Sequence, residues 1–231
     1  MFLKAKEILE AELKDKTQIG FYKTTNKNDI IDNLNQAFAV QLPEAVAKHG
    51  MSKIAILFED NTQIMKVPCN GFYDDGYNEN NEYYCEWKDF KNATRENPFD
   101  YCLSELNKYE KAVEYNVEMF FAKVSFYDNT ENNYPLYAQE KVYFADEIEV
   151  PAATEESLNY IKDKKSNDIH WNTLSEEWLA LAVDKYGKEA VENFIHFITR
   201  VEPEIVTDEI KYAYRADGSP VLFDFSGYRE A

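Results

Sequence analysis

Hydrophobic residues recur along the first fifty positions at the three-to-four-residue spacing that is typical of amphipathic helices. Residues 3–16 carry a thin apolar stripe between charged residues, and residues 29–48 carry a wider one. The two stripes predict two helices, each with one buried face. Pro43 lies inside the second pattern, where it is expected to break or kink the helix, and Gly50 provides its end.

Shorter apolar runs, rich in β-branched and aromatic residues, predict strands. The runs at 53–60 and 62–68 are joined by an Asp-Asn turn and predict a hairpin. Two longer candidates follow at 117–128 and 136–150, with a loop of turn residues between them. Residues 210–225 place an Asp-Gly turn between two alternating runs, which predicts a second hairpin.

Four further helices are predicted, over residues 99–113, 154–165, 174–186 and 188–199. The elements then run as helices, strands, helix, strands, helices and hairpin. This order predicts an α+β fold: an antiparallel sheet with a helical layer, and C-terminal helices followed by a β-hairpin.

A polar stretch over residues 150–170 is the expected domain boundary. It divides the chain into an α+β domain at 1–150, with an acidic aromatic loop at 70–90, and a helical segment plus C-terminal hairpin at 151–231. The alternative is one continuous domain, because a chain of this length suits either arrangement.

The formal charge of −18 is unevenly distributed along the chain. Residues 1–53 hold eight lysines against seven acids, whereas the remainder holds 17 basic and 36 acidic residues. A surface this negative repels nucleic acids and anionic lipids, and it attracts cationic protein surfaces.

Acidic residues concentrate at 125–160, a stretch that contains eight acidic residues and one lysine. On an extended strand Glu147 and Glu149 would point to the same side about 6.6 Å apart. This spacing is comparable with two phosphate steps along one DNA strand, and Glu202 and Glu204 repeat it. The hypothesis is a carboxylate array that mimics nucleic-acid phosphates, and the alternative is a solvated acidic face that keeps the protein soluble.

The loop at 70–90 mixes aromatic rings with carboxylates. Tyrosine and tryptophan are favoured at the centres of interfaces, and acids around them would select a basic partner. The alternative is a loop whose rings fold back on the sheet. The predicted partner-binding residues are Asp74, Asp75, Tyr77, Glu79, Glu82, Tyr84, Trp87, Asp146, Glu147 and Glu149.

Motifs for catalysis or metal binding are lacking in the sequence. It contains no glycine-rich phosphate loop, no G-x-S-x-G, and no histidine with a His or Cys three or four residues away. The three cysteines form no C-x-x-C pair and suggest reduced thiols, with Cys102 on the buried face of a helix. We therefore predict no catalytic residues, no metal and no cofactor, and two surface histidines with one packed histidine.

The sequence has no signal peptide and no apolar run near the ~18–20 residues of a membrane span, so a cytoplasmic location is expected. The leading hypothesis is a non-enzymatic inhibitor of phage or mobile-element anti-defence type. It would bind a basic nuclease or other DNA- or RNA-binding protein by charge mimicry, without contacting nucleic acid or membrane itself. An immunity protein against a cognate toxin, an enzyme with dispersed active-site residues and a structural or assembly protein are the alternatives. The oligomeric state stays open.

Overall fold

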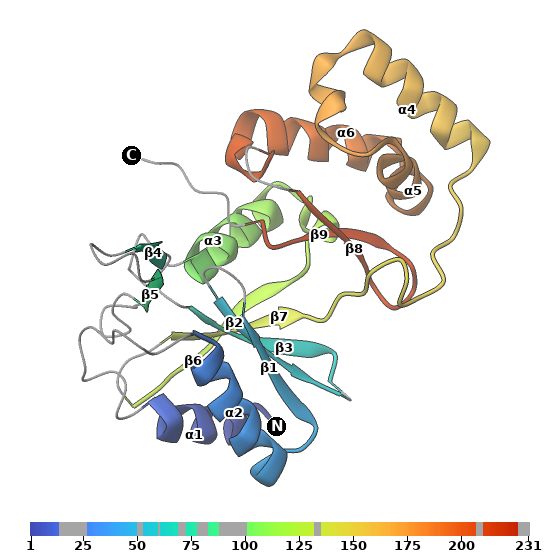
Figure 1. Cartoon of the computed structure of the whole chain (residues 1–231). Helices are drawn as coiled ribbons and strands as arrows, with labels where there is room; N and C mark the ends of the chain where they lie inside the picture. Colours follow the sequence, from blue (N-terminus) through green and yellow to red (C-terminus); the bar gives the residue numbers. More distant parts are fainter. Residues whose placement is uncertain are drawn as a thin grey trace. The chain divides into compact units, whose positions relative to one another are not determined.

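A computed structural model describes residues 1–13, 27–49, 53–59, 61–68, 73–77, 83–87, 101–131, 135–206 and 210–225. These residues form a five-stranded antiparallel sheet packed with helices, and helices near the C-terminus are followed by a β-hairpin (Figure 1). The predicted α+β fold is confirmed.

The sheet has the strand order β1-β2-β3-β7-β6, and every neighbouring pair is antiparallel. Its strands are β1 (Ala45–His49), β2 (Lys53–Phe58), β3 (Gln63–Pro68), β7 (Pro135–Glu140) and β6 (Val124–Asn129). The β2–β3 hairpin agrees with the apolar runs in the sequence. Strands far apart in the chain thus complete one sheet, with β1 and β6 at its edges.

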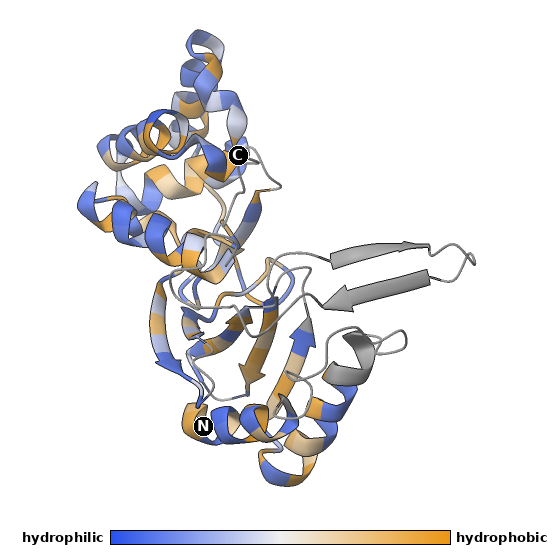
Figure 2. Ribbon diagram, turned by 90° about the vertical axis from the view of Figure 1, so that its left-hand side faces the viewer, coloured by the Kyte–Doolittle hydropathy of each residue, from blue (hydrophilic) through white to orange (hydrophobic). Residues whose placement is uncertain are grey.

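Helices α1 (Phe2–Leu13) and α2 (Lys27–Gln41) lie against one face of this sheet (Figure 1). The central strands of the sheet carry long hydrophobic stretches, whereas the helices alternate between hydrophobic and hydrophilic residues (Figure 2). Leu34 and Phe38 are fully buried one turn apart on α2, as the helical spacing requires. The side chains that share this core include Ala5, Ile8, Leu9, Leu34, Phe38, Ala47, Ile54, Ile56, Phe58, Met65, Val67 and Leu136.

The predicted helix over 29–48 is wrong in its last turns, because α2 ends at Gln41 and residues 45–49 form β1. Proline lacks an amide hydrogen and clashes with the preceding helical turn, so Pro43 stops the helix. A tight turn follows, in which the Ala45 amide donates to the Leu42 carbonyl at 2.9 Å.

Both long strand predictions cover too many residues. Within 117–128 the strand begins only at Val124, and Glu118–Phe120 forms a 3₁₀ turn that buries Phe120 completely. Within 136–150 the strand ends at Glu140. In the first place burial of Phe120 outweighs the local β-propensity, and in the second a turn at 145–147 follows the strand.

The predicted loop at 70–90 contains a strand pair, which corrects that prediction. Strands β4 (Tyr73–Tyr77) and β5 (Tyr83–Trp87) pair antiparallel, with Asp75 opposite Cys85. Aromatic residues favour strands, and here this preference outweighs the acids and the glycine.

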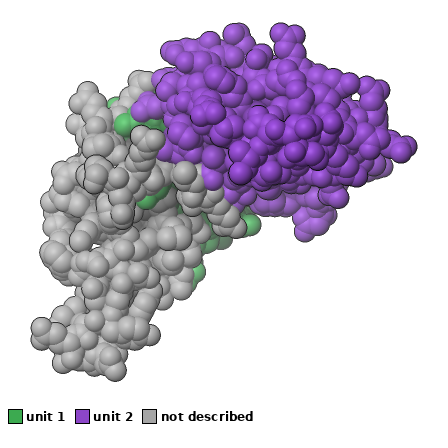
Figure 3. All heavy atoms as spheres, turned by 90° about the horizontal axis from the view of Figure 1, so that it is seen from above, with its two compact units in different colours: residues 1–104, 124–140 green, residues 105–123, 141–231 purple. Residues whose placement is uncertain are grey.

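Contacts divide the chain into two compact units, which Figure 3 colours separately. The first comprises residues 1–104 and 124–140, and the second comprises residues 105–123 and 141–231. Helix α3 (Tyr101–Glu114) gives its first turn to the first unit and the rest to the second. The predicted domains at 1–150 and 151–231 stay a prediction, since compactness does not test whether a segment folds alone.

Among the remaining elements of the second unit, three helices and the final hairpin correspond to the predictions at 154–165, 174–186, 188–199 and 210–225, whereas the short 3₁₀ and π-helical turns were not predicted. These elements are α4 (Glu155–Asn167), η3 (Ile169–Thr173), α5 (Glu176–Tyr186), α6 (Lys188–His196), the π-helical turn η4 (Phe197–Val201), η5 (Pro203–Val206), β8 (Lys211–Tyr214) and β9 (Pro220–Phe223). An aromatic core joins them: Phe120 stacks on Phe194 with ring centroids 4.3 Å apart, and Trp178 packs beside both. Among the helices described, none combines the length and apolar character needed to cross a bilayer.

Candidate functional site

The segment at 141–151, called the acidic segment below, runs beside the β8–β9 hairpin (Figure 1). The backbones of Tyr143 and Tyr214 exchange two hydrogen bonds, at 2.8 and 2.9 Å. At the other end Pro151 lies so close to Gly218 that a Cβ there would sit 2.7 Å from the proline Cδ. The hairpin therefore fixes both ends of this segment.

Three predicted binding residues, Asp146, Glu147 and Glu149, project from the acidic segment and are exposed. They do not form the predicted extended array, because residues 145–147 form a turn. A carboxylate oxygen of Glu147 accepts a hydrogen bond from the Phe144 amide at 2.8 Å and so stabilises that turn. The three acids are exposed on one short segment, but not on an extended strand.

Phe144 is a further surface residue of the acidic segment, and sequence reasoning missed it. Its side chain is 48% exposed, although the ring packs edge-to-face on Phe223 at 5.6 Å. In the sequence it looks like an inward-facing residue of a strand. Only the pairing of Tyr143 with the distant β8 strand explains its exposure.

Carboxylates elsewhere in the described structure are often neutralised by lysines. Lys108 Nζ lies 3.7 Å from Glu204, and Lys111 pairs with Glu202. These two glutamates, predicted as a second phosphate-like pair, instead pair with lysines of α3: Glu202 directly precedes the 3₁₀ turn Pro203–Val206, and Glu204 lies within it. Burial lowers the pKa of the Lys108 ammonium, and Glu204 opposes this effect.

A second neutralised cluster joins α4 to α6. Glu192 accepts from Lys164 at 2.5 Å and from the Tyr160 hydroxyl at 2.7 Å, and both bonds lower the pKa of the carboxyl. Burial, followed by the hydrogen bond to Glu192, raises the pKa of Tyr160 to about 12. By contrast, Asp146, Glu147 and Glu149 form no ion pair in the part of the chain that the structure describes.

The other predicted binding residues belong to the first unit. Asp74, Asp75 and Tyr77 lie on β4, and Tyr84 and Trp87 lie on β5. Their backbones are joined in one ladder, in which Asp74 is opposite Glu86.

Glu79 and Glu82 lie outside the described residues.

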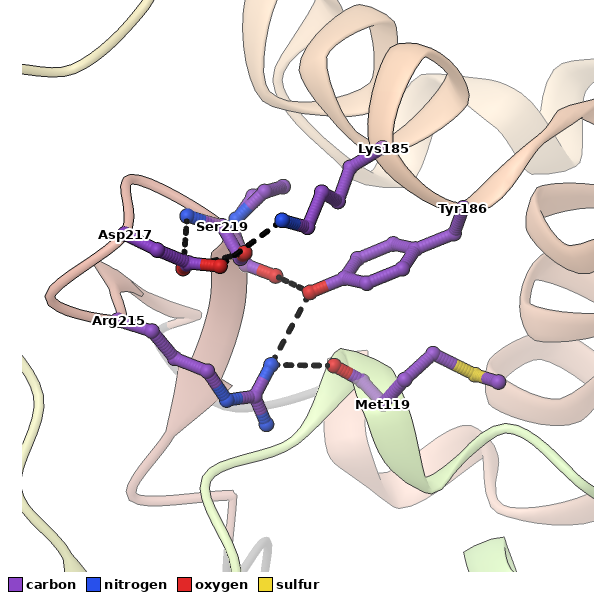
Figure 4. A network of polar contacts seen from close by, with 7 residues as sticks. Met119, Lys185, Tyr186, Arg215, Asp217 and Ser219 are labelled. Atoms are coloured by element: carbon purple, nitrogen blue, oxygen red, sulfur yellow. Dashed lines mark hydrogen bonds and ion pairs between the residues drawn. The ribbon is translucent and has the colours of Figure 1, made fainter.

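A polar network fixes the turn between β8 and β9 (Figure 4). Asp217 accepts from Lys185 at 2.8 Å, and its other oxygen accepts from the Ser219 hydroxyl and amide at 2.5 and 3.0 Å. These bonds, with that from Lys185 the strongest, hold the pKa of the Asp217 carboxyl well below its usual range. The Ser219 side chain is buried, so its hydroxyl serves the turn.

Arg215 extends the network to the segment at 105–123 (Figure 4). Its guanidinium donates to the Met119 and Phe121 carbonyls at 2.9 and 3.1 Å and to the Tyr186 hydroxyl at 3.0 Å. The Tyr186 hydroxyl donates in turn to the Pro220 carbonyl at 3.1 Å. No local sequence pattern indicates this network, because its members are scattered along the chain.

The described histidines and cysteine show no metal-site geometry. His170 Nε2 contacts an Arg200 nitrogen at 2.8 Å, and His196, predicted to be packed, is exposed. Cys102 is buried, as predicted. Within the described residues no three His, Cys, Asp or Glu side chains come together in a group that could hold a metal ion.

Comparison of the chain with protein-family models, curated proteins and solved structures finds no match.

Proposed function

We propose that this chain is a non-enzymatic acidic protein that binds a basic, nucleic-acid-handling protein and inhibits it by charge mimicry. One observation carries the proposal. Asp146, Glu147 and Glu149 are exposed together and form no ion pair among the described residues, whereas many other carboxylates are held by lysines. Charges left unpaired on a surface are available to a partner of opposite sign.

The half-exposed ring of Phe144 supports the same proposal, because it lies within the acidic segment. Aromatic residues are enriched at interface centres, where they bury a large area at low entropic cost. An aromatic ring within a rim of carboxylates suits a cationic protein surface with an apolar recess. A phage or mobile-element antagonist of a host nuclease is the most concrete form of this function.

The test compares two triple variants with the same change in net charge. In the first, Asp146→Asn, Glu147→Gln and Glu149→Gln remove the charges, while the glutamine oxygen can still accept from the Phe144 amide. In the control, Glu114→Gln, Asp163→Asn and Glu189→Gln remove three exposed charges elsewhere. Each protein is immobilised and incubated with a cell lysate at low salt, and bound proteins are eluted with a salt gradient and identified.

We expect the parent protein to retain DNA- or RNA-binding proteins that elute with salt and are displaced by duplex DNA. The first variant should release them at clearly lower salt, whereas the control should resemble the parent. Retention that does not depend on salt, or that duplex DNA does not affect, would contradict charge mimicry. One salt-resistant complex would instead favour the immunity protein.

A further inference from the structure

Strand β1 is an edge strand, yet outward-facing backbone groups of Ala45 and Ala47 are hydrogen bonded. The edge of a sheet normally offers free N–H and C=O groups, to which a strand of another chain can pair. Here the Ala47 amide donates to Asn35 Oδ1 at 2.7 Å, and Asn35 Nδ2 donates to the Ala47 carbonyl at 3.1 Å. The side-chain amide of Asn35 thus binds both the N–H and the C=O group of Ala47.

The ladder with β2 shows that these groups point outward. In an antiparallel pair, residues alternately bond the neighbouring strand and face away from it. The Glu59 amide donates to the Glu44 carbonyl at 3.0 Å, so Glu44, Val46 and Lys48 face β2. Ala45 and Ala47 therefore face the outer edge.

Both outward-facing amides at the start of β1 are used within the chain. The Ala45 amide donates to the Leu42 carbonyl, in the turn that follows α2. The Ala47 amide is held by Asn35, which α2 presents at the level of the strand. Without Asn35, the outer edge at Ala47 would expose a donor and an acceptor beside Val46, whose side chain is 47% exposed.

We propose that Asn35 seals this edge and prevents β1 from pairing with β1 of a second copy of the chain. Its amide presents an N–H donor and a carbonyl acceptor to Ala47, the same pair that a residue of a neighbouring strand would supply. The expected partner of an opened edge is β1 of a second copy, because antiparallel pairing of two identical strands is symmetric and forms a closed dimer. This inference is independent of the proposed function.

The test measures molar mass by light scattering after size-exclusion chromatography over a range of concentrations. Asn35→Ala should at least double the mass of the parent as concentration rises, while Asn33→Ala, at an exposed position of the same helix, should leave it unchanged. Adding Val46→Lys to Asn35→Ala should restore the parental mass, because lysines on facing edges repel. Parental mass for folded Asn35→Ala at all concentrations would overturn the proposal.

Hydrogen exchange measured on the parent protein is a second test, which does not depend on whether a variant folds. A sealed edge predicts that the Ala47 amide exchanges as slowly as the amides that β1 donates to β2. Exchange of Ala47 at the rate of an exposed peptide would show that the seal does not exist in solution, and the proposal would fail.

Discussion

The guanidinium of Arg215 donates to the hydroxyl of Tyr186 at 3.0 Å, and this contact ties the end of α5 to the β8–β9 hairpin. The same guanidinium also satisfies the carbonyls of Met119 and Phe121. Arg215 therefore connects three separate segments of the second unit with one side chain.

Replacement of Arg215 should be costly for this reason. We expect Arg215→Ala to lower the free energy of unfolding by about 2–4 kcal/mol, because several acceptors lose their donor. Arg215→Lys should recover only part of the loss, since an ammonium cannot reproduce the planar fork. Urea unfolding followed by circular dichroism measures both. A loss no larger than that of the exposed Arg200→Ala would contradict this role.

The Lys185–Asp217 pair predicts a pH dependence. The pKa of Asp217 is lower in the folded chain than in the unfolded one, so its contribution is present above about pH 4 and is lost as the pH falls toward the folded value. Asp217→Asn should cost up to about 1 kcal/mol at pH 7, a modest value because the group is exposed.

The measurement for this pair is the stability difference between the parent and Asp217→Asn at several pH values. It should shrink steadily below about pH 4. Lys185→Met should also destabilise the protein at pH 7, because it breaks the same ion pair. A difference that is constant from pH 7 to pH 2 would refute the assignment.

Gly218 and Pro151 are expected to be energetically coupled. Gly218 has φ +78°, and its missing Cβ would lie 2.7 Å from the proline. Gly218→Ala should destabilise the protein by about 2–4 kcal/mol through backbone strain and a clash. Pro151→Ala should rescue part of this loss.

Gly187→Ala serves as the control for this coupling. Gly187 also has positive φ, but nothing lies within 4 Å of its Cβ position. Its cost should be backbone strain alone, and Pro151→Ala should not relieve it. Strictly additive effects of Gly218→Ala and Pro151→Ala would show that the two residues do not clash.

Two phenylalanines of the second unit should behave in opposite ways. Phe194 is fully buried against Phe120 and Trp178, so Phe194→Ala should cost about 3–5 kcal/mol of stability. Phe144 is half exposed, so Phe144→Ala should cost less than about 1.5 kcal/mol.

For Phe144 the informative measurement is binding. If the proposed function is correct, the captured partner should elute from the immobilised Phe144→Ala variant at lower salt than from the parent. The thermal unfolding of the variant should stay close to that of the parent. Unchanged retention would remove Phe144 from the interface without deciding whether the carboxylates act.

The helices with clear periodicity could be predicted from sequence, since their apolar positions report directly which face is buried. The capping of α4 by Thr154 and the end of α5 at Gly187 are local signals of the same kind. The strand β1 was mistaken for the end of a helix because Ala45 and Val46 continue the spacing of α2. Residues 45–49 form a strand rather than a helix because they pair with β2, and a local sequence pattern does not reveal that pairing.

The candidate site was only partly predictable. Charge identified Asp146, Glu147 and Glu149, but their turn geometry depends on the hairpin at 211–223, far along the chain. The exposure of Phe144 depends on the same long-range contact. The lysines that neutralise Glu202 and Glu204 come from α3, and only the tertiary fold brings them there.

The two units alternate along the polypeptide, and this has a consequence for biosynthesis. A nascent chain emerging from the ribosome can pair β1, β2 and β3 early, but the sheet has to wait for β7, which is translated after 105–123 has already appeared. Phe120 and Phe121 of that stretch are buried in the folded protein. They remain without their final neighbours until the last helices and the hairpin have been made. Translation speed over the second half of the message, and the chaperones that meet it, should therefore govern how much of this protein reaches its native state.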